Sequence, residues 1–397
     1  MSYYLIATNS FVTHKKPLSI YVHWPFCVSK CPYCDFNSHV RESIDHKTWL
    51  ESYLKDLAYQ KQFAPNHEIK SIFFGGGTPS LMPAHIIEGI IDQINKIWDV
   101  SKDVEISMEA NPNSSEINKF LDFKLAGINR ISLGIQSLKS DVLKFLGRAH
   151  SSQEALHAIE SAQKVFKSYS LDFIYAHPKH TPQEWDEELI EILSINPPHL
   201  SLYQLTIEPQ TPFQSYERLG KFKMPNEIVS EQFYDQTVTT MINSGYMHYE
   251  VSNFAKPGHA CQHNMAYWQS KDYLGIGPGA HGRHTKNSRR IATRAHRSPE
   301  KWLSLVQQQG HALTHEETLT DQESLEEILL MGLRLTEGID LKKLDQYASN
   351  GSWRNKTAHK RNNLAKEGLI THEKEKLKTT PQGLKKLNAI IEYLLID

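Results

Sequence analysis

The sequence predicts an α/β fold built on a TIM-like parallel sheet with helices outside it, followed by a mainly helical, winged-helix-like C-terminal domain. Short runs rich in β-branched and aromatic residues alternate with longer helical patterns from residue 19 to residue 253, which is typical of repeated βα units. Polar and glycine residues follow the strands, where barrels of this kind place their active sites. Three of the four cysteines lie in one short loop after the first strand.

The predicted elements follow one another along the chain. Strands are expected at 19–23, 71–74, 104–108, 130–133, 171–174 and 199–203, with a further short strand at 249–253. Helices are expected at 44–63, 84–98, 153–166, 183–193 and 226–244. Because the carboxyl ends of parallel strands meet at one edge of a sheet, we expect the residues after these strands to share one pocket.

The composition restricts the class of protein. Hydrophobic residues make up 39% of the 397 residues, enough for an ordinary packed core, and the net charge of −1 argues against a protein that chiefly coats nucleic acid or an anionic membrane. No apolar run approaches the ~20 residues that span a bilayer, and the N-terminus lacks the basic and apolar segments of a signal peptide. We therefore expect a cytoplasmic protein with reduced cysteines.

The cysteine loop is the most specific feature of the chain. A structural zinc site usually takes four ligands in separated pairs, and a disulfide would leave an odd thiol. An iron–sulfur cluster fits better, because thiolates from Cys27, Cys31 and Cys34 can hold three irons of a [4Fe–4S] cube. The fourth iron would then be open to an outside ligand.

The C-x3-C-x2-C spacing, with Tyr33 before the last cysteine, resembles the radical S-adenosylmethionine (radical SAM) superfamily. There the open iron is chelated by the methionine end of S-adenosylmethionine, and the resemblance implies a partial (β/α)6 barrel that is open on one side. The run from Tyr21 to Cys27 narrows the likeness to the branch of oxygen-independent coproporphyrinogen III oxidase. That oxidase carries a further cysteine two residues after the third one, whereas this chain has Phe36, which is similar to the HemW family of haem chaperones.

Candidate contacts for S-adenosylmethionine follow the strands. The triple glycine 75–77 lacks side chains, so that its backbone can approach a ligand closely. Glu109 and Asp172 can accept hydrogen bonds from ribose hydroxyls or an ammonium group, and Gln136 and Arg148 match oxidase-family positions that contact a second S-adenosylmethionine, whose binding here is left open. The plainer alternatives are a glycine-rich turn, helix caps and a surface charge. The full set that the resemblance implies is Tyr21, Tyr33, Gly76, Gly77, Thr78, Glu109, Gln136, Arg148 and Asp172.

A second informative run, 263–268, reads His-Asn-x-x-Tyr-Trp and resembles the HemW signature. His263 is a suitable axial ligand for haem iron, and the flanking aromatic rings can stack on the macrocycle, with Cys261 as a weaker candidate ligand. Two plainer hypotheses compete, a hydrogen-bonded core histidine and aromatic rings that pack the barrel rim. A zinc site would use His248, His259, Cys261 and His263, but their spacing matches no familiar zinc pattern.

The run 275–282 contains a G-x-G-x-x-G pattern. A dinucleotide-binding fingerprint needs a strand before the glycines and a helix after them, whereas residues 283–288 are polar and irregular. We therefore reject that motif and expect the glycines to shape a loop that covers the open barrel.

The pattern changes from about residue 302. An amphipathic helix is expected at 323–335, and its apolar stripe consists of Leu325, Ile328, Leu329 and Leu333. A helix near 364–370 leads into a two-stranded wing near 377–384, and acidic residues interrupt its basic face, which favours a partner-docking or lid domain over DNA binding. The predicted organisation is an N-terminal extension at 1–17, a radical SAM partial barrel at 18–255, a connecting segment at 256–300 and a C-terminal domain at 301–397.

The resemblance implies a haem chaperone that carries a [4Fe–4S] cluster and S-adenosylmethionine, binds haem, and delivers it to haem proteins, respiratory and membrane-associated ones among them. The alternative is an oxygen-independent coproporphyrinogen III oxidase that uses a 5′-deoxyadenosyl radical, which Phe36 and the run 263–268 disfavour. A winged-helix nucleic-acid binder with a redox-sensing cluster is disfavoured by the balanced charge.

Overall fold

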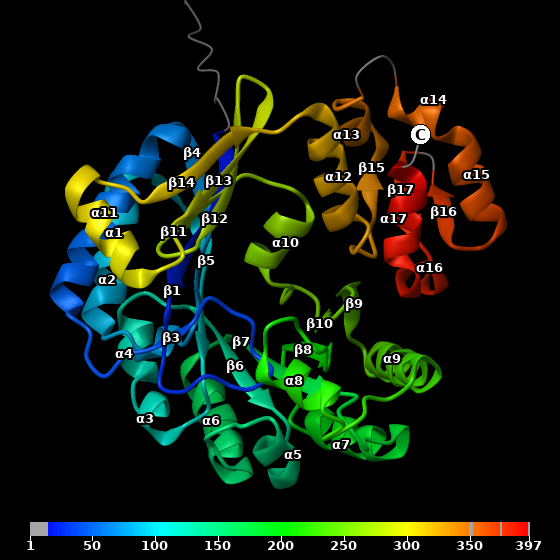
Figure 1. Cartoon of the computed structure of the whole chain (residues 1–397), viewed down its shortest axis with the longest axis horizontal. Coiled ribbons are helices and arrows are strands. Elements are labelled where there is room, and N and C mark those ends of the chain that lie inside the picture. The colour runs from blue at the N-terminus through cyan, green and yellow to red at the C-terminus, as the bar shows by residue number, and fades with distance from the viewer. Residues whose placement is uncertain (1–14, 349–351, 374, 396–397) are drawn as a thin grey trace, which may run out of the picture.

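The computed structural model describes residues 15–348, 352–373 and 375–395, and its framework is one large sheet (Figure 1). Six parallel strands stand next to one another in chain order within it. They are β1 (Lys16–Trp24), β4 (His67–Gly76), β5 (Asp99–Ala110), β6 (Arg130–Gln136), β7 (Ser168–Tyr175) and β8 (His199–Gln204). The six predicted strands are therefore confirmed, each longer than the run that predicts it. Of the predicted N-terminal extension 1–17, residues 1–14 lie outside the described residues.

The two faces of the parallel strands differ in chemistry. Side chains alternate along a strand, so that in β1 Ile20 points to one face and Ser19 and Tyr21 to the other. Ile20 pairs in register with Ile72, and both are completely buried in the main hydrophobic core. The opposite face carries polar side chains that are in register from strand to strand, among them Ser19, Ser71, Glu105, Glu109, Ser132, Asp172 and Ser201.

Helices cover the apolar face of the sheet. The long ones are α1 (His46–Gln60), α2 (Ala84–Ile97), α6 (Ser152–Val165), α7 (Pro182–Ser194) and α9 (Glu227–Asn243). The five predicted helices are thus confirmed. α6 and α7 each begin with a reciprocal capping box, Ser151 with Glu154 and Thr181 with Glu184, which satisfies backbone N–H groups that a helix start otherwise leaves free.

The further strand predicted at 249–253 is wrong as a single element. The structure has two short antiparallel strands there, β9 (Met247–Glu250) and β10 (Asn253–Ala255), and β10 pairs with β8 at the edge of the sheet. The buried carboxylate of Glu250 accepts hydrogen bonds from Ser252 N at 2.9 Å and from the Asn253 amide, and these bonds fix the turn that separates the strands.

The expectation that the glycines of 275–282 shape a covering loop is also wrong. They join two strands of the large sheet, β11 (Tyr273–Ile276), which runs parallel to β1, and β12 (His281–Lys286), which returns antiparallel. A side chain on Gly275 would overlap the backbone oxygen of His281, so that glycine is needed where these strands cross closely. The rejection of a dinucleotide fingerprint stands, because a strand follows the glycines where that motif needs a helix.

The sheet extends beyond β12 through β13 (Arg289–Ala295) and β14 (Leu313–Thr318). On α11 (Pro299–Gln309), Trp302 stacks on Trp49 of α1 with ring centroids 5.4 Å apart. Two elements of the range 301–397 therefore lie with the large sheet, and the range 256–300 holds sheet strands as well as a connection. Antiparallel strands with one solvated face read as polar sequence, which explains the irregular pattern seen there.

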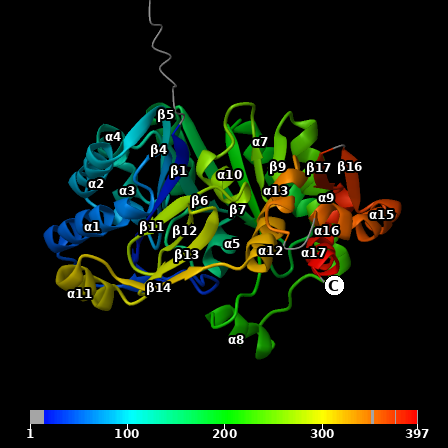
Figure 2. The ribbon, with the colours of Figure 1, turned by 90° about the horizontal axis from the view of Figure 1, so that it is seen from above.

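A second hydrophobic core forms the C-terminal end of the chain and lies beside the sheet, away from α1 and α2 (Figure 2). It is built by α12 (Asp321–Gly332), α15 (Ala358–Lys366), α17 (Leu387–Leu395) and the antiparallel pair β16 (Ile370–Glu373) and β17 (Lys376–Thr379). The predicted apolar stripe of 323–335 is buried, and β15 (Ile339–Asp340) adds a third strand to the predicted wing. In the described part of the chain, no helix has the length and apolar character that crossing a bilayer requires.

Candidate functional site

The three cysteines lie directly beyond the carboxyl end of β1. The chain leaves β1 through the short β2 (Phe26–Cys27), which pairs with β3 (His39–Val40), and the loop between these strands carries Cys31 and Cys34. A turn closes the loop, with Cys34 N donating to Cys31 O at 3.1 Å. All three thiols are free and partly exposed.

The thiols interact with one another and with two donors. Burial raises the pKa of the Cys27 and Cys34 thiols, and the nearby Cys31 sulfur raises both further. Thr78 Oγ1 donates to Cys27 Sγ at 3.4 Å, and Arg148 Nη1 donates to Cys31 Sγ at 3.5 Å. Such donors stabilise thiolates. The donor set fits a cluster held at three corners, with thiolates on three different irons.

The triple glycine 75–77 is tied to the cysteine loop by packing. A Cβ on Gly77 would lie 2.7 Å from Phe26 O and 3.0 Å from Cys27 Sγ. Gly76 has a φ of +117°, which side chains disfavour, and its N–H donates to Glu109 Oε2 at 3.1 Å. Gly77 is thus required by close contact with the loop, which a plain glycine-rich turn would not demand.

Two carboxyl groups, Glu109 on β5 and Asp172 on β7, interact across the inner face of the sheet. Burial, opposed by the Gly76 N–H and aided by the Asp172 charge, raises the pKa of Glu109 to about 8. Burial also raises the pKa of Asp172, against hydrogen bonds from Ser132 and Ser170 at 2.8 and 3.0 Å. Glu109 is therefore mostly protonated at neutral pH, and a cationic ligand would favour its ionised form.

Arg148 is not a solvated surface charge. Its Nη2 donates to Asn111 Oδ1 at 2.6 Å and to Gly134 O at 3.1 Å, beside Gln136, which ends β6 with a φ of +69°. Asn111 was not among the predicted site residues. Its Nδ2 donates to Thr78 Oγ1 at 3.3 Å, so that it links the arginine to the glycine turn. The signal for it in the sequence is the Glu-Ala-Asn-Pro run after the third strand.

Tyr21 lies against the triple glycine. A Cβ on Gly75 would lie 2.8 Å from the Tyr21 ring, and the Tyr21 hydroxyl is 3.0 Å from His23 Nδ1. His23, a second residue that sequence reasoning missed, reaches Asn37 O through Nε2 at 2.9 Å and so fixes the end of the cysteine loop. Tyr33 lies in the loop itself, where burial raises the pKa of its hydroxyl. Of the predicted S-adenosylmethionine contacts, Gly77, Thr78 and Arg148 thus meet the cysteine loop, whereas Glu109 and Asp172 lie on the inner face of the sheet. Their role stays a prediction.

His263 lies in a closed, buried environment, in contrast to the partly exposed cysteine loop. It is the second residue of α10 (Gln262–Trp268) and is 1% exposed, and burial lowers its pKa to about 3. Its Nδ1 is 2.9 Å from Ser71 Oγ and its Nε2 is 2.8 Å from the Tyr267 hydroxyl. Neither ring nitrogen is free to bind iron in this conformation, which favours the hydrogen-bonded core histidine over the haem ligand. Cys261, the weaker candidate ligand, is buried and directed to Glu105 at 3.4 Å.

The zinc hypothesis is wrong for the same reason. His248 Nε2 bonds to Val251 O, and Cys261 and His263 have the separate partners just described. Across residues 15–348, 352–373 and 375–395, no three His, Cys, Asp or Glu side chains gather closely enough to chelate a single ion. A cluster makes no such demand, because its thiolates bind different irons and stand further apart.

Two family models match the chain, one in the parallel strands of the large sheet and one in the C-terminal domain. A model of the radical SAM superfamily matches residues 21–191, from β1 into α7. A model of the HemN C-terminal domain matches residues 319–384, beginning where the second hydrophobic core begins.

Relatives of similar length share about a third of their residues with this chain. Heme chaperone HemW of Escherichia coli is 35% identical over 96% of this chain and 99% of that protein, and HemW of Haemophilus influenzae is 35% identical over 96% and 98%. The mitochondrial radical S-adenosyl methionine domain-containing protein 1 of Danio rerio is 34% identical over 99% and 90%. The solved structure of coproporphyrinogen III oxidase (HemN) from Escherichia coli superposes with a TM-score of 0.79 at 22% identity, over 96% of this chain and 90% of that one, which shows a shared fold.

Proposed function

The chain belongs to the radical SAM superfamily and, within it, to the HemW family, and from that premise we propose that it is a haem chaperone. In this proposal it works in the cytoplasm, binds haem alongside a [4Fe–4S] cluster and S-adenosylmethionine, and hands the haem to haem proteins, respiratory ones among them. The observation that carries the proposal is the 35% identity to HemW over nearly the whole of both chains.

Residues around the cysteine loop could bind both the cluster and S-adenosylmethionine. Cys27, Cys31 and Cys34 would hold the cluster, which when bound supplies an open iron for the methionine end of S-adenosylmethionine. The backbone at 75–77 would lie along that end of the ligand, because its side chains are absent. Glu109, whose pKa burial raises, would lose its proton to solvent when the positively charged ligand binds, and its carboxylate would then accept a hydrogen bond from the ligand.

Apolar side chains beside the cysteine loop support a haem surface there. Val28, Phe36 and Val40 are 71%, 56% and 50% exposed, and Val40 is in register with Cys27. Large exposed apolar side chains can mark a binding surface, and the faces of a haem macrocycle are apolar. We therefore place haem at this surface rather than at His263, whose nitrogens are both engaged.

Phe36 also separates the two candidate functions. Coproporphyrinogen III oxidase activity remains the second candidate, because the chain shares its fold with HemN of Escherichia coli. The oxidase branch carries a cysteine where this chain has Phe36, and the exposed phenyl ring at that position favours haem contact over that chemistry.

The test uses anaerobically reconstituted full-length protein. Haem titration should give a saturable Soret band, and the loaded protein should transfer haem to apomyoglobin. With reductant, S-adenosylmethionine and coproporphyrinogen III, it should form no protoporphyrinogen. Efficient protoporphyrinogen formation, or the absence of saturable haem binding, would overturn the chaperone function. Phe36→Ser should weaken haem binding, whereas Leu121→Ser, a change at a similarly exposed apolar residue on α4 (Phe120–Leu125), should not.

A further inference from the structure

The function proposed above gives no role to the run 263–268. The residues around this run indicate a role for it. It forms α10, which Figure 1 shows between the strands β11 and β12 on one side and β9 and β10 on the other. Its hydrogen bonds reach Ser71 on β4 and Glu105 on β5, which precede Gly75 and Glu109 on those strands. These contacts of α10 therefore lie closer to the amino ends of the strands than the cysteine loop does.

The start of α10 is anchored to β5 and β6 by a buried carboxylate. Glu105 accepts hydrogen bonds from Gln262 N at 3.1 Å and from His263 N at 3.2 Å, which satisfies N–H groups that the helix leaves unpaired. Arg130 Nε stands 3.9 Å from the same carboxylate, and both side chains are at least nine-tenths buried. The helix is thus held against the inner face of the sheet by charge and by hydrogen bonds.

The side chains of α10 complete a hydrogen-bonded chain with one direction. Ser71 Oγ donates to Ser19 Oγ at 2.8 Å, so that Ser71 accepts from His263 Nδ1–H. His263 Nε2 then accepts from the Tyr267 hydroxyl at 2.8 Å. Each polar atom in the chain has a partner, which fixes the rotation of the His263 ring.

The fixed ring of His263 supports the S-adenosylmethionine end of the barrel through two aromatic contacts. It stacks on Phe73, with ring centroids 5.0 Å apart and planes 26° from parallel. Phe73 in turn stacks on Tyr21 at 6.3 Å and 24°. Tyr21 lies against Gly75, so that a continuous stack runs from α10 to the triple glycine.

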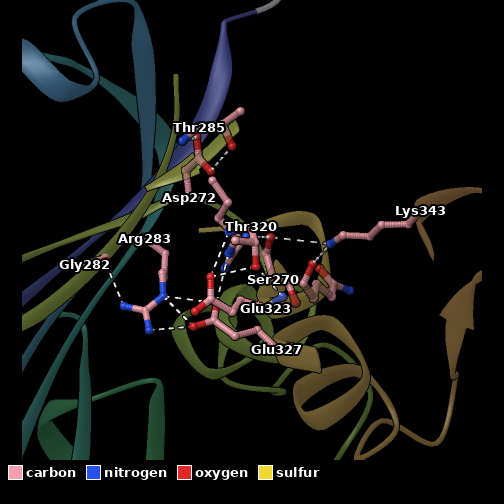
Figure 3. Close-up of polar contacts among 11 residues, drawn as sticks. Ser270, Asp272, Gly282, Arg283, Thr285, Thr320, Glu323, Glu327 and Lys343 are labelled. Atoms are coloured by element: carbon pink, nitrogen blue, oxygen red, sulfur yellow. Dashed lines mark hydrogen bonds and ion pairs between the residues drawn. The ribbon is translucent and has the colours of Figure 1, made fainter. Parts of the chain in front are cut away.

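The other end of α10 is fixed by the C-terminal domain and by the large sheet. Lys343 of the C-terminal domain donates to the carbonyl oxygens of Gln269 and Ser270, and Figure 3 shows Lys343 reaching Ser270. Arg290 Nη1, on β13 of the large sheet, donates to Ser270 O at 2.9 Å. These cations meet the carbonyl end of the helix, where positive charge is favoured. The guanidinium of Arg334 also lies 4.5 Å from the centre of the Trp268 ring.

We propose that His263 and Tyr267 are positioning residues for the S-adenosylmethionine site: α10 supports Tyr21 and the triple glycine from below, and its own position is set by the C-terminal domain. The inference rests on the proposed function in so far as it assumes that the site binds S-adenosylmethionine. It assigns to the run 263–268 a task other than haem ligation.

The test compares two tyrosines that each lose one hydroxyl hydrogen bond. Tyr267→Phe removes the donor to His263, and Tyr246→Phe removes a matched donor to Pro197 O at 2.6 Å, in the outer layer of the fold. In the cofactor-free protein, amide hydrogen exchange of the peptide 71–78 should become faster in Tyr267→Phe and stay unchanged in Tyr246→Phe. This arm needs no bound ligand.

After reconstitution, the change that S-adenosylmethionine causes in the EPR spectrum of the reduced cluster reports its affinity. Tyr267→Phe should weaken binding about fivefold, the equivalent of one hydrogen bond, with the haem Soret spectrum unchanged. His263→Gln, which keeps a donor and an acceptor, should bind more tightly than His263→Leu. Equal affinity and equal exchange in the two tyrosine variants would overturn the inference. If the wild type binds no S-adenosylmethionine, the proposed function fails, and the exchange arm still decides the positioning role.

Discussion

The two ends of the barrel interior are built from the same strands in opposite ways. At the carboxyl ends, the cysteine thiols are free and partly exposed, and Glu109 has a pKa raised to about 8. At the amino ends, His263 has a partner for each nitrogen, and Glu105 caps the helix that carries it. Polar groups without full partners are costly unless a ligand completes them, whereas closed chains hold a fold together. The difference supports the two proposals above, ligand binding at the first end and a supporting role at the second.

The largest effect is expected when one thiol is removed at each end of the barrel interior. Cys31→Ala should lose most of the about four irons that a reconstituted [4Fe–4S] protein binds, because one corner of the cube would have no ligand. Cys261→Ala, at the buried end, should keep the full iron content. Iron and sulfide analysis measures both. A full cluster in Cys31→Ala, or its loss in Cys261→Ala, would contradict the assignment.

A methyl group at the glycine turn should have the next largest effect. Gly77→Ala places a Cβ against Phe26 O and Cys27 Sγ, so that the loop must shift, and we expect S-adenosylmethionine affinity to fall at least tenfold, since about 1.4 kcal/mol of strain suffices. Gly89→Ala on α2 is the matched control, because its Cβ would meet only the flexible end of Leu50, 3.0 Å away. Equal affinities in the two variants, measured by EPR titration, would contradict this reading of the turn.

The raised pKa of Glu109 should make both stability and ligand binding at the carboxyl ends depend on pH. Because the folded-state pKa of about 8 lies above the ordinary value of 4.5, the stability contribution of Glu109 is complete below pH 4.5 and is lost as the pH rises toward 8. If the ligand needs the carboxylate, S-adenosylmethionine affinity should rise by up to about tenfold per pH unit below pH 8 and level off above it.

Glu109→Gln provides the control for that titration. It should remove the contribution of Glu109 to the pH dependence of both the unfolding free energy and the affinity, because the amide does not titrate. Chemical denaturation and EPR titration between pH 5.5 and pH 9 measure the two, and a pH profile that is identical in the variant would show that another group is responsible.

The smallest effect on S-adenosylmethionine binding is expected where the supporting end joins the C-terminal domain. Glu327 accepts from Arg283 at 2.6 Å and from Arg290 at 3.2 Å (Figure 3). Glu327→Gln should lower the unfolding free energy by about 1–3 kcal/mol, because two largely buried guanidinium groups lose a charged partner. Glu326→Gln, on the exposed face of the same helix, should change it little. S-adenosylmethionine affinity should stay nearly constant in both, which separates stability from site geometry.

Regular elements were predictable because they depend on local patterns. Alternating and helical periodicities located the six parallel strands and the five long helices, and the buried stripe on α12 was read correctly. The run 275–282 was misread because its glycines serve strand crossing, which depends on His281 meeting Gly275 in space. Asn111 and His23 were missed because each acts as a link between partners that other segments supply.

The sequence alone determined the cysteine loop, because the C-x3-C-x2-C spacing keeps the three thiols in one short segment, whatever residues pack around it. It could not determine what His263 does. A histidine is a ligand or a support according to whether its nitrogens are free, and the partner of Nδ1 is Ser71, 192 residues away along the chain. Only the packing of α10 against the sheet brings those two side chains together, and so only the tertiary structure shows that both nitrogens of His263 have partners.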